Sequence, residues 1–152
     1  MEELNIVLTL KRLEGFDLSP IERVLIAHTG TVQLLLSLWF REEVKMKVKR
    51  QWEQDGNIAR WTSLYTDTFG EVCSANSVIP LAQNAQEILE DVRAKSLGLG
   101  QIVVKHRVLP TRTLMGFDIS PTELHRTYVL EGDRLRFTIT ESFSRECMRR
   151  VL

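Results

Sequence analysis

The sequence has few of the residues from which metal centres and reactive thiol sites are built. It contains 2 Cys and 3 His among 152 residues. Cys73 and Cys147 lie far apart along the chain, and the histidines are scattered at His28, His106 and His125. Neither set has the spacing of a zinc site or of a Cys–His nucleophile. We therefore expect no metal and no cofactor, and two buried, unreactive thiols.

The sequence also lacks an excess of charge of one sign. Lys plus Arg and Asp plus Glu number 20 each, and the pI is about 6.8. Surfaces that bind nucleic acids or anionic membranes usually need an excess of positive charge. The lysines between Lys45 and Lys49 alternate with apolar residues, which is typical of the solvent face of an antiparallel strand. We expect neither a nucleic-acid partner nor a membrane partner.

Long apolar runs are missing as well. The most apolar stretch, Leu34 to Phe40, is far too short to cross a bilayer. The first residues, Met1-Glu2-Glu3, carry acid where a signal peptide carries base. With 43% hydrophobic and 26% charged residues, the composition is that of an ordinary folded protein. We expect a cytoplasmic protein with one domain over residues 1–152.

Alternating apolar and polar residues predict several strands. The clearest case is the segment around Leu135, Phe137 and Ile139, which follows turn residues at Glu131-Gly-Asp133. Its predicted partner strand covers Leu124 to Leu130. The same pattern, or a short apolar run between turns, predicts four more strands over Val44–Arg50, Ile58–Tyr65, Val72–Ile79 and Thr111–Ile119.

Helix signals fall in two blocks. Ser19-Pro-Ile-Glu22 has the form of a capping box with Pro at the first helical position, and the helix should end near Gly30. A second helix is predicted over Val32 to Phe40, and a third over Leu81 to Lys95. For Gln101 to Val108 we expect a helical turn followed by extended chain. Strands next to their chain neighbours, with helices in separate blocks, predict an α+β domain on an antiparallel sheet.

Three places in the sequence are candidates for binding. Glu141 is a lone carboxylate at the end of an apolar strand, so it is either exposed there or held in a pocket that uses it. Arg60 is either an ion-paired strand residue or a ligand-binding cation. Gly30-Thr31 joins two helices and offers backbone N–H groups that suit an anion. Ser96–Gly100 lacks the lysine of a phosphate-binding loop and predicts a helix C-cap and a corner.

Read together, these places resemble the chorismate lyase family. Thr140-Glu141-Ser142-Phe143 is similar to the Thr-Glu-x-Phe of that family, and Arg60 with Leu64 is similar to its Arg-x-x-x-Leu strand. Leu99-Gly100 matches a Leu-Gly pair that opens a short helix, and Gly30-Thr31 falls where two helices meet over the ligand. The resemblance covers nearly the whole chain from Ser19 onward.

The resemblance implies an enzyme that eliminates pyruvate from chorismate to give 4-hydroxybenzoate in a buried pocket. It assigns catalysis to Glu141 and Arg60, and it requires no metal or organic cofactor. Ligand contacts fall on Gly30, Thr31, Arg60, Ala75, Leu99 and Glu141. The sequence departs from the enterobacterial pattern at Ala75, where that pattern has Gly, at Gly30, which replaces a bulkier residue, and in a shorter loop after Gln51.

A second hypothesis is that the protein has this fold and binds this class of ligand but catalyses no reaction. A domain of this fold can sense a small aromatic acid without chemistry, as effector-binding domains do. Such a binder would retain Arg60 for the carboxylate, whereas it would not need Glu141. In both hypotheses the partner is a small molecule, and release of pyruvate from chorismate separates them.

Overall fold

Six antiparallel strands form one continuous sheet in the computed structural model, which describes residues 11–27 and 31–151. The strands are β1 (Lys45–Gln54), β2 (Asn57–Thr66), β3 (Gly70–Pro80), β4 (Thr111–Ile119), β5 (Glu123–Gly132) and β6 (Leu135–Ser144). Their order across the sheet is β1-β2-β3-β6-β5-β4. Two three-stranded meanders therefore meet where β3 pairs with β6, and the predicted antiparallel α+β fold is confirmed.

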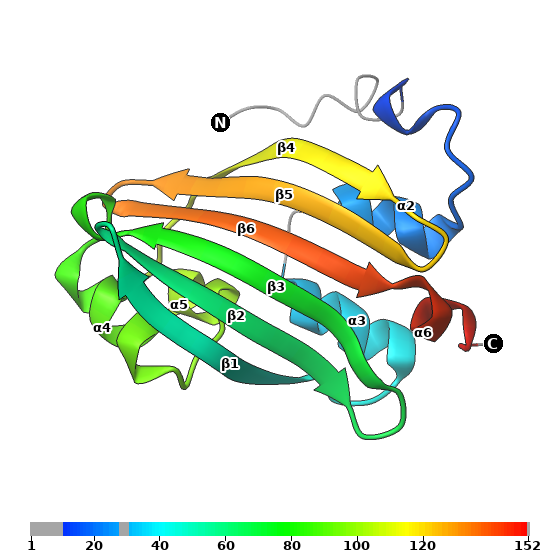
Figure 1. The fold of residues 1–152 in the computed structure, drawn as a ribbon, viewed down its shortest axis with the longest axis horizontal. Coiled ribbons are helices and arrows are strands. Elements are labelled where there is room, and N and C mark those ends of the chain that lie inside the picture. Colours follow the sequence, from blue (N-terminus) through cyan, green and yellow to red (C-terminus); the bar gives the residue numbers. More distant parts are fainter. Residues whose placement is uncertain (1–10, 28–30, 152) are drawn as a thin grey trace.

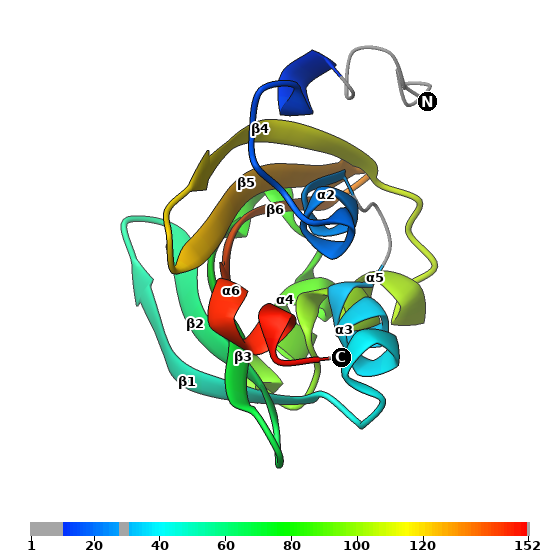
Figure 2. The same ribbon diagram turned by 90° about the vertical axis from the view of Figure 1, so that its right-hand side faces the viewer.

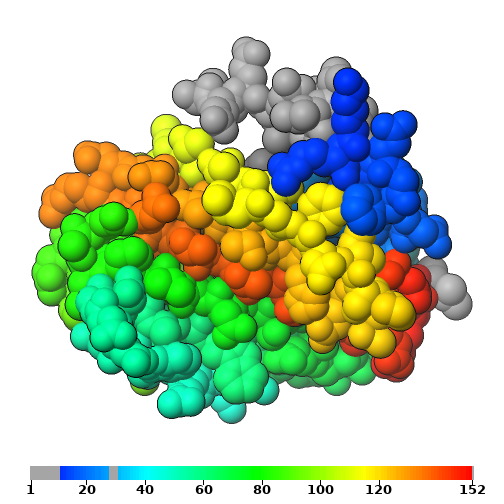
Figure 3. Space-filling model, turned by 45° about the horizontal axis from the view of Figure 1, so that its top comes forward, coloured from blue at the N-terminus to red at the C-terminus, as the bar shows by residue number. Residues whose placement is uncertain are grey.

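Helices cover one face of this sheet. They are α2 (Pro20–Ala27), α3 (Val32–Phe40), α4 (Gln86–Ala94), α5 (Leu99–Lys105) and the short α6 (Arg145–Arg149). The sheet curls around them, so that its inner face is concave (Figures 1 and 2). Strands from both meanders reach the surface on the opposite, outer side (Figure 3). Among the described residues, no helix is long and apolar enough to cross a membrane.

The first predicted helix start is confirmed in detail. The Ser19 N–H donates to Glu22 Oε1 at 3.0 Å, and the Glu22 N–H donates to Ser19 Oγ at 3.4 Å. These reciprocal bonds are those of a capping box. The helix α2 ends at Ala27, and the next helix has the predicted bounds of Val32 to Phe40.

A buried arginine from the other end of the chain holds the start of α2. The Nε of Arg145 donates to Glu22 Oε2 at 2.6 Å, and its Nη2 donates to Glu22 Oε1 at 3.3 Å. The same guanidinium donates to the Ser120 and Asp17 carbonyls. Burial alone would raise the pKa of Glu22, but hydrogen bonds from Arg145 and Ser19 outweigh it and lower that pKa.

The predicted helix over Leu81 to Lys95 is wrong at its start. Leu81–Gln83 form a 3-10 turn, and the α-helix begins only at Gln86. The Asn84 side-chain amide donates to the Pro80 and Arg136 carbonyls and accepts from the Arg136 N–H. A polar side chain that ties the chain to β3 and β6 keeps this segment out of the helix.

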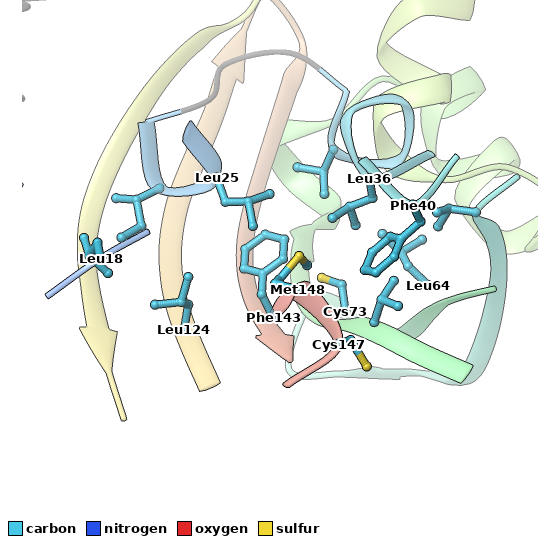
Figure 4. Close-up of a cluster of buried hydrophobic side chains, with 14 of the residues drawn as sticks. Leu18, Leu25, Leu36, Phe40, Leu64, Cys73, Leu124, Phe143, Cys147 and Met148 are labelled. Atoms are coloured by element: carbon cyan, nitrogen blue, oxygen red, sulfur yellow. The ribbon is translucent and has the colours of Figure 1, made fainter. Parts of the chain in front are cut away.

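The concave face holds two apolar cores. One lies under α2, α3 and α6 and includes Leu36, Phe40 and Phe143 (Figure 4). The other lies under α4 and α5 and includes Ile102 and Phe137. On β6, every second residue from Leu135 to Phe143 is buried. The alternation predicted this for Leu135, Phe137 and Ile139. Glu141 takes one of these inward positions, so its carboxylate enters the interior.

Candidate functional site

A cavity lies on the concave face between the two cores. The centre of a water-sized sphere can move through about 90 Å³ of it, several times the roughly 10–15 Å³ that one water needs. Its apolar walls come from both cores, and its polar walls come from helix ends and strand residues. The lining residues are Thr31, Val32, Gln33, Met46, Thr62, Leu64, Ala75, Ser77, Gly98, Leu99, Gly100, Gln101, Arg112, Tyr128, Leu130, Ile139 and Glu141.

Glu141 is the acidic side chain of this lining, and an arginine faces it from the neighbouring strand. Arg126 lies directly opposite Glu141 in the β5–β6 register. Its Nε donates to Glu141 Oε1 at 2.7 Å. The two residues are 2% and 4% exposed. A buried carboxylate needs such a charged, hydrogen-bonded partner to remain ionised.

Arg126 also binds the end of the helix that packs over it. Its Nη1 donates to the carbonyls of Leu25 and Ile26, in the last turn of α2. Carbonyls in the last turn of a helix have no intrahelical partner, and the helix dipole favours a cation there. The Arg126 guanidinium therefore links Glu141 on the cavity wall to the C-terminal turn of α2.

Tyr128 and Arg112 form the adjoining wall. The Arg112 guanidinium carbon lies 4.3 Å from the centre of the Tyr128 ring, and that of Arg126 lies 4.8 Å from it. Cations at such distances are attracted to the face of an aromatic ring. The phenol ring therefore contacts two guanidinium groups, and it lines the cavity.

Burial shifts the acidity of these groups. It raises the pKa of the Tyr128 phenol, with Glu141 as the next cause, and the two arginines only partly offset this. It lowers the pKa of Arg112, which as a guanidinium still remains charged near neutrality. Arg112 and Arg126 are positive and Glu141 is negative, so these three described charges sum to +1. An anionic ligand would complement this charge.

Two helix starts complete the walls. Thr31 is the N-cap of α3, and the first residues of that helix line the cavity. Gly98, Leu99 and Gly100 line it from the start of α5, where the Gln101 side chain accepts from the Gly98 N–H at 2.8 Å. A Cβ built on Gly100 would lie 3.8 Å from Thr31 Cγ2. The two helix starts are thus in close contact.

Arg60 does not belong to this lining, although its side chain is buried. Its Nη2 donates to the Val92 carbonyl at 2.8 Å, its Nη1 to the Leu97 carbonyl at 2.9 Å, and its Nε to Gln51 Oε1 at 2.9 Å. Burial lowers its pKa to about 10. Arg60 therefore holds the α4–α5 connection, whose next residues, Gly98 and Leu99, form the cavity wall.

The sheet register explains why Arg60 and Glu141 do not meet. Thr62, Ala75 and Glu141 lie in one row across β2, β3 and β6, and Arg60 is two residues further along β2. Two strand spacings and two residues give a Cα separation of roughly 12 Å. The structure brings Glu141, Thr31, Ala75 and Leu99 together at the cavity. Gly30 and His28 lie outside the described residues.

Arg112, Arg126 and Tyr128 are the site residues that the sequence analysis missed. A signal for Arg126 was present, because the β5–β6 hairpin fixes its register. Gly132 pairs with Leu135 beside the turn, and counting away from that pair on both strands reaches Arg126 and Glu141 together. The same count passes Tyr128, which pairs with Ile139. Arg112 had no comparable signal, since its position depends on where β4 packs.

The cysteines and histidines that the structure describes form no comparable site. Cys73 and Cys147 are both buried and free. Burial, and then the charge of Glu141, raise the pKa of the Cys73 thiol, which disfavours the reactive thiolate. Within residues 11–27 and 31–151, no cluster of three or more His, Cys, Asp or Glu side chains could hold a metal ion.

Comparison with known proteins identifies no relative of this protein. No model of a protein family matches the sequence, and a search of curated proteins finds no match.

Proposed function

We propose that the protein is a chorismate lyase-like enzyme that eliminates pyruvate from chorismate and forms 4-hydroxybenzoate in this cavity. The observation that carries the proposal is the buried Glu141 carboxylate, which faces Arg126 at 2.7 Å on the wall of a cavity with both apolar and polar sides. An ionised carboxylate is costly to bury, and the motif resemblance supports a use for it.

The lining matches the parts of such a ligand. Arg112 offers a planar, permanently charged fork for a carboxylate. Leu99, Leu130 and Ile139 offer apolar surface for a six-membered ring. Chorismate carries a second carboxylate, for which the first backbone N–H groups of α3 are suitable donors.

The reaction needs orientation and a proton acceptor more than it needs a nucleophile. Loss of a ring proton and of the enolpyruvyl ether makes the ring aromatic, so the product is strongly favoured. Glu141 would accept the ring proton, since the Oε1 bond to Arg126 leaves a carboxylate with further acceptor capacity at Oε2. The cavity holds the reacting groups together, which supplies much of the rate enhancement.

Arg60 takes a different place in this proposal from the one that the resemblance implies. Its hydrogen bonds to Val92 and Leu97 support a role in positioning the wall around Leu99. A direct contact between Arg60 and the ligand remains a prediction of the resemblance that this geometry does not favour.

Incubation of the purified protein with chorismate tests the proposal. We expect stoichiometric release of pyruvate and 4-hydroxybenzoate, above the uncatalysed rate. If 4-hydroxybenzoate binds but chorismate is not converted, the protein is a binder of aromatic acids and the lyase proposal is wrong. If neither compound binds, both hypotheses fail.

Melting temperature reports binding without turnover. A ligand at one hundred times its Kd stabilises the native state by about 2.7 kcal/mol, which for a chain of this length is roughly 5–10 °C. We expect such a rise with 4-hydroxybenzoate. Benzoate should raise the melting temperature less, because it leaves the polar partner of the hydroxyl unpaired.

A further inference from the structure

We infer that Tyr128 is a second catalytic residue of the proposed reaction, the proton donor to the departing enolpyruvyl oxygen. This inference rests on the proposed function and adds the acid that an elimination needs beside its base. The ether oxygen leaves with the electron pair of the broken carbon–oxygen bond, so a donor close to it lowers the barrier.

Few of the lining side chains can act as an acid or a base in catalysis. Among the lining residues that the structure describes, the remaining polar groups are hydroxyls of Ser and Thr, amides of Gln and the guanidinium of Arg112. Aliphatic hydroxyls and amides are far too weakly acidic, and a guanidinium does not release its proton. Glu141 and Tyr128 therefore form the available acid–base pair.

The sheet places these two residues close together on the face that lines the cavity. Tyr128 lies opposite Ile139 on β6, which is two residues from Glu141 on the same face. Such diagonal neighbours on adjacent strands have Cα atoms roughly 7–8 Å apart. Both line the cavity, so one ring bound between them can meet the base on one carbon and the donor on the next.

The charges around Tyr128 support a donor. Arg112 faces the ring from β4 and Arg126 lies beside it on β5, while Glu141 and Cys73 face it from β6 and β3. Burial and Glu141 raise the pKa of Tyr128, so the phenol keeps its proton until a base of similar strength develops beside it. An enolate oxygen is such a base, and the two guanidinium groups would stabilise its charge.

The step balances without any added reagent. Glu141 takes the ring proton, and the electrons of that carbon–hydrogen bond form the new ring double bond. The carbon–oxygen bond breaks toward oxygen, which takes the Tyr128 proton and leaves as enolpyruvate, and this tautomerises to pyruvate. The proton on Glu141 then returns to the Tyr128 phenolate through water, which restores both groups.

Tyr128→Phe tests the inference, because it removes one oxygen and keeps the ring that the two arginines contact. Tyr65→Phe is the matched control, since Tyr65 is the other tyrosine of the chain and pairs with Lys45 near the end of β2. We expect Tyr128→Phe to lower kcat about 100-fold or more. The Kd for 4-hydroxybenzoate and the rate of the Tyr65→Phe variant should be unchanged.

Each other outcome identifies which idea fails. If wild-type protein releases no pyruvate from chorismate, the proposed function is wrong and this inference falls with it. If the wild type is active and Tyr128→Phe is equally fast, only the inference is overturned. Loss of 4-hydroxybenzoate binding together with turnover would make Tyr128 a binding residue, which also overturns the donor role.

A measurement on the wild type decides the question if Tyr128→Phe does not fold. The ring proton of chorismate is bonded to carbon and does not exchange with solvent, whereas a phenol proton does. A single-turnover rate, which product release cannot mask, should therefore fall in heavy water. An equal rate in heavy and ordinary water would overturn the inference.

Discussion

Arg126 and Glu141 face each other across β5 and β6, with Nε and Oε1 2.7 Å apart and both side chains buried. The arginine continues beyond this pair to the Leu25 and Ile26 carbonyls at the end of α2. The acidic group of the cavity and the helix above it thus depend on one guanidinium. Because both charges are desolvated, each is needed to compensate the other.

Glu141→Leu should therefore lower the free energy of unfolding by about 3–5 kcal/mol, because it leaves the Arg126 charge buried and uncompensated. The double variant Glu141→Leu with Arg126→Met should recover much of this loss. Urea unfolding of the two single variants, the double variant and the wild type measures the coupling. Additive effects would show that the pair contributes no interaction of its own.

Glu141→Gln tests the chemical role of the same residue while it keeps the shape of the side chain and one acceptor oxygen for Arg126. We expect pyruvate release from chorismate to fall by about 10²–10⁴-fold, because an amide cannot accept the ring proton. Glu90→Gln, on an exposed position of α4, is the control and should retain the wild-type rate. Wild-type turnover by Glu141→Gln would remove Glu141 from the reaction.

Arg112→Ala should abolish the rise in melting temperature that 4-hydroxybenzoate causes in the wild type. The change removes the cation that lines the cavity beside Tyr128, and loss of one partner of a desolvated charge pair costs about 2–5 kcal/mol. Arg134→Ala, which removes a largely exposed arginine near Glu87, should leave the rise intact. A full rise in Arg112→Ala would place the carboxylate elsewhere.

Arg60→Met should make the cavity wall around Leu99 more mobile, and it should remove no direct contact with the ligand. The variant leaves the Val92 and Leu97 carbonyls without their guanidinium donor, and each lost bond of this kind costs about 1–3 kcal/mol. Hydrogen exchange should speed up in the last turn of α4 and in residues 96–100. If exchange there is unchanged while ligand affinity collapses, Arg60 contacts the ligand directly, as the resemblance implies.

Because of the buried pair of Glu22 and Arg145, the free energy of unfolding should decrease at acidic pH. The folded pKa of Glu22 lies below its ordinary value, so this group stabilises the fold above its unfolded pKa and loses that contribution as pH falls through the folded pKa. Unfolding followed from neutral to acidic pH should show less loss in Glu22→Gln than in the wild type. Parallel curves for the two proteins would exclude this linkage.

Local signals predicted the elements of this fold because each depends on neighbouring residues. The alternation around Phe137 follows from one buried sheet face, and the capping box at Ser19 follows from orphan N–H groups at a helix start. The helix over Gln86–Ala94 was predicted too early because its start is set by Asn84, whose partners include Arg136, 52 positions away. No window of sequence contains that contact.

The site residues also divide into those that local sequence indicates and those that depend on distant contacts. Glu141 could be singled out as a candidate because a carboxylate interrupts an apolar strand, but the pattern left open whether it is exposed or buried. Composition and strand pattern do not separate Arg60, Arg126 and Arg145, which differ in the carbonyls and carboxylates that the folded chain brings to them. Only the register of the β5–β6 hairpin points to Arg126. Arg60 lies on the correct face of β2 but two strands from Glu141, and this distance exists only once β3 and β6 are paired.

The bond between Glu22 and Arg145 joins positions 123 apart in the sequence. During synthesis, α2 emerges before any of the strands on which it rests, and both arginines that hold its ends come from the last quarter of the chain. We expect that α2 cannot pack against the sheet during synthesis until β5 and β6 have emerged and paired. The cavity wall that Arg126 supports would then be among the last parts of the nascent protein to form.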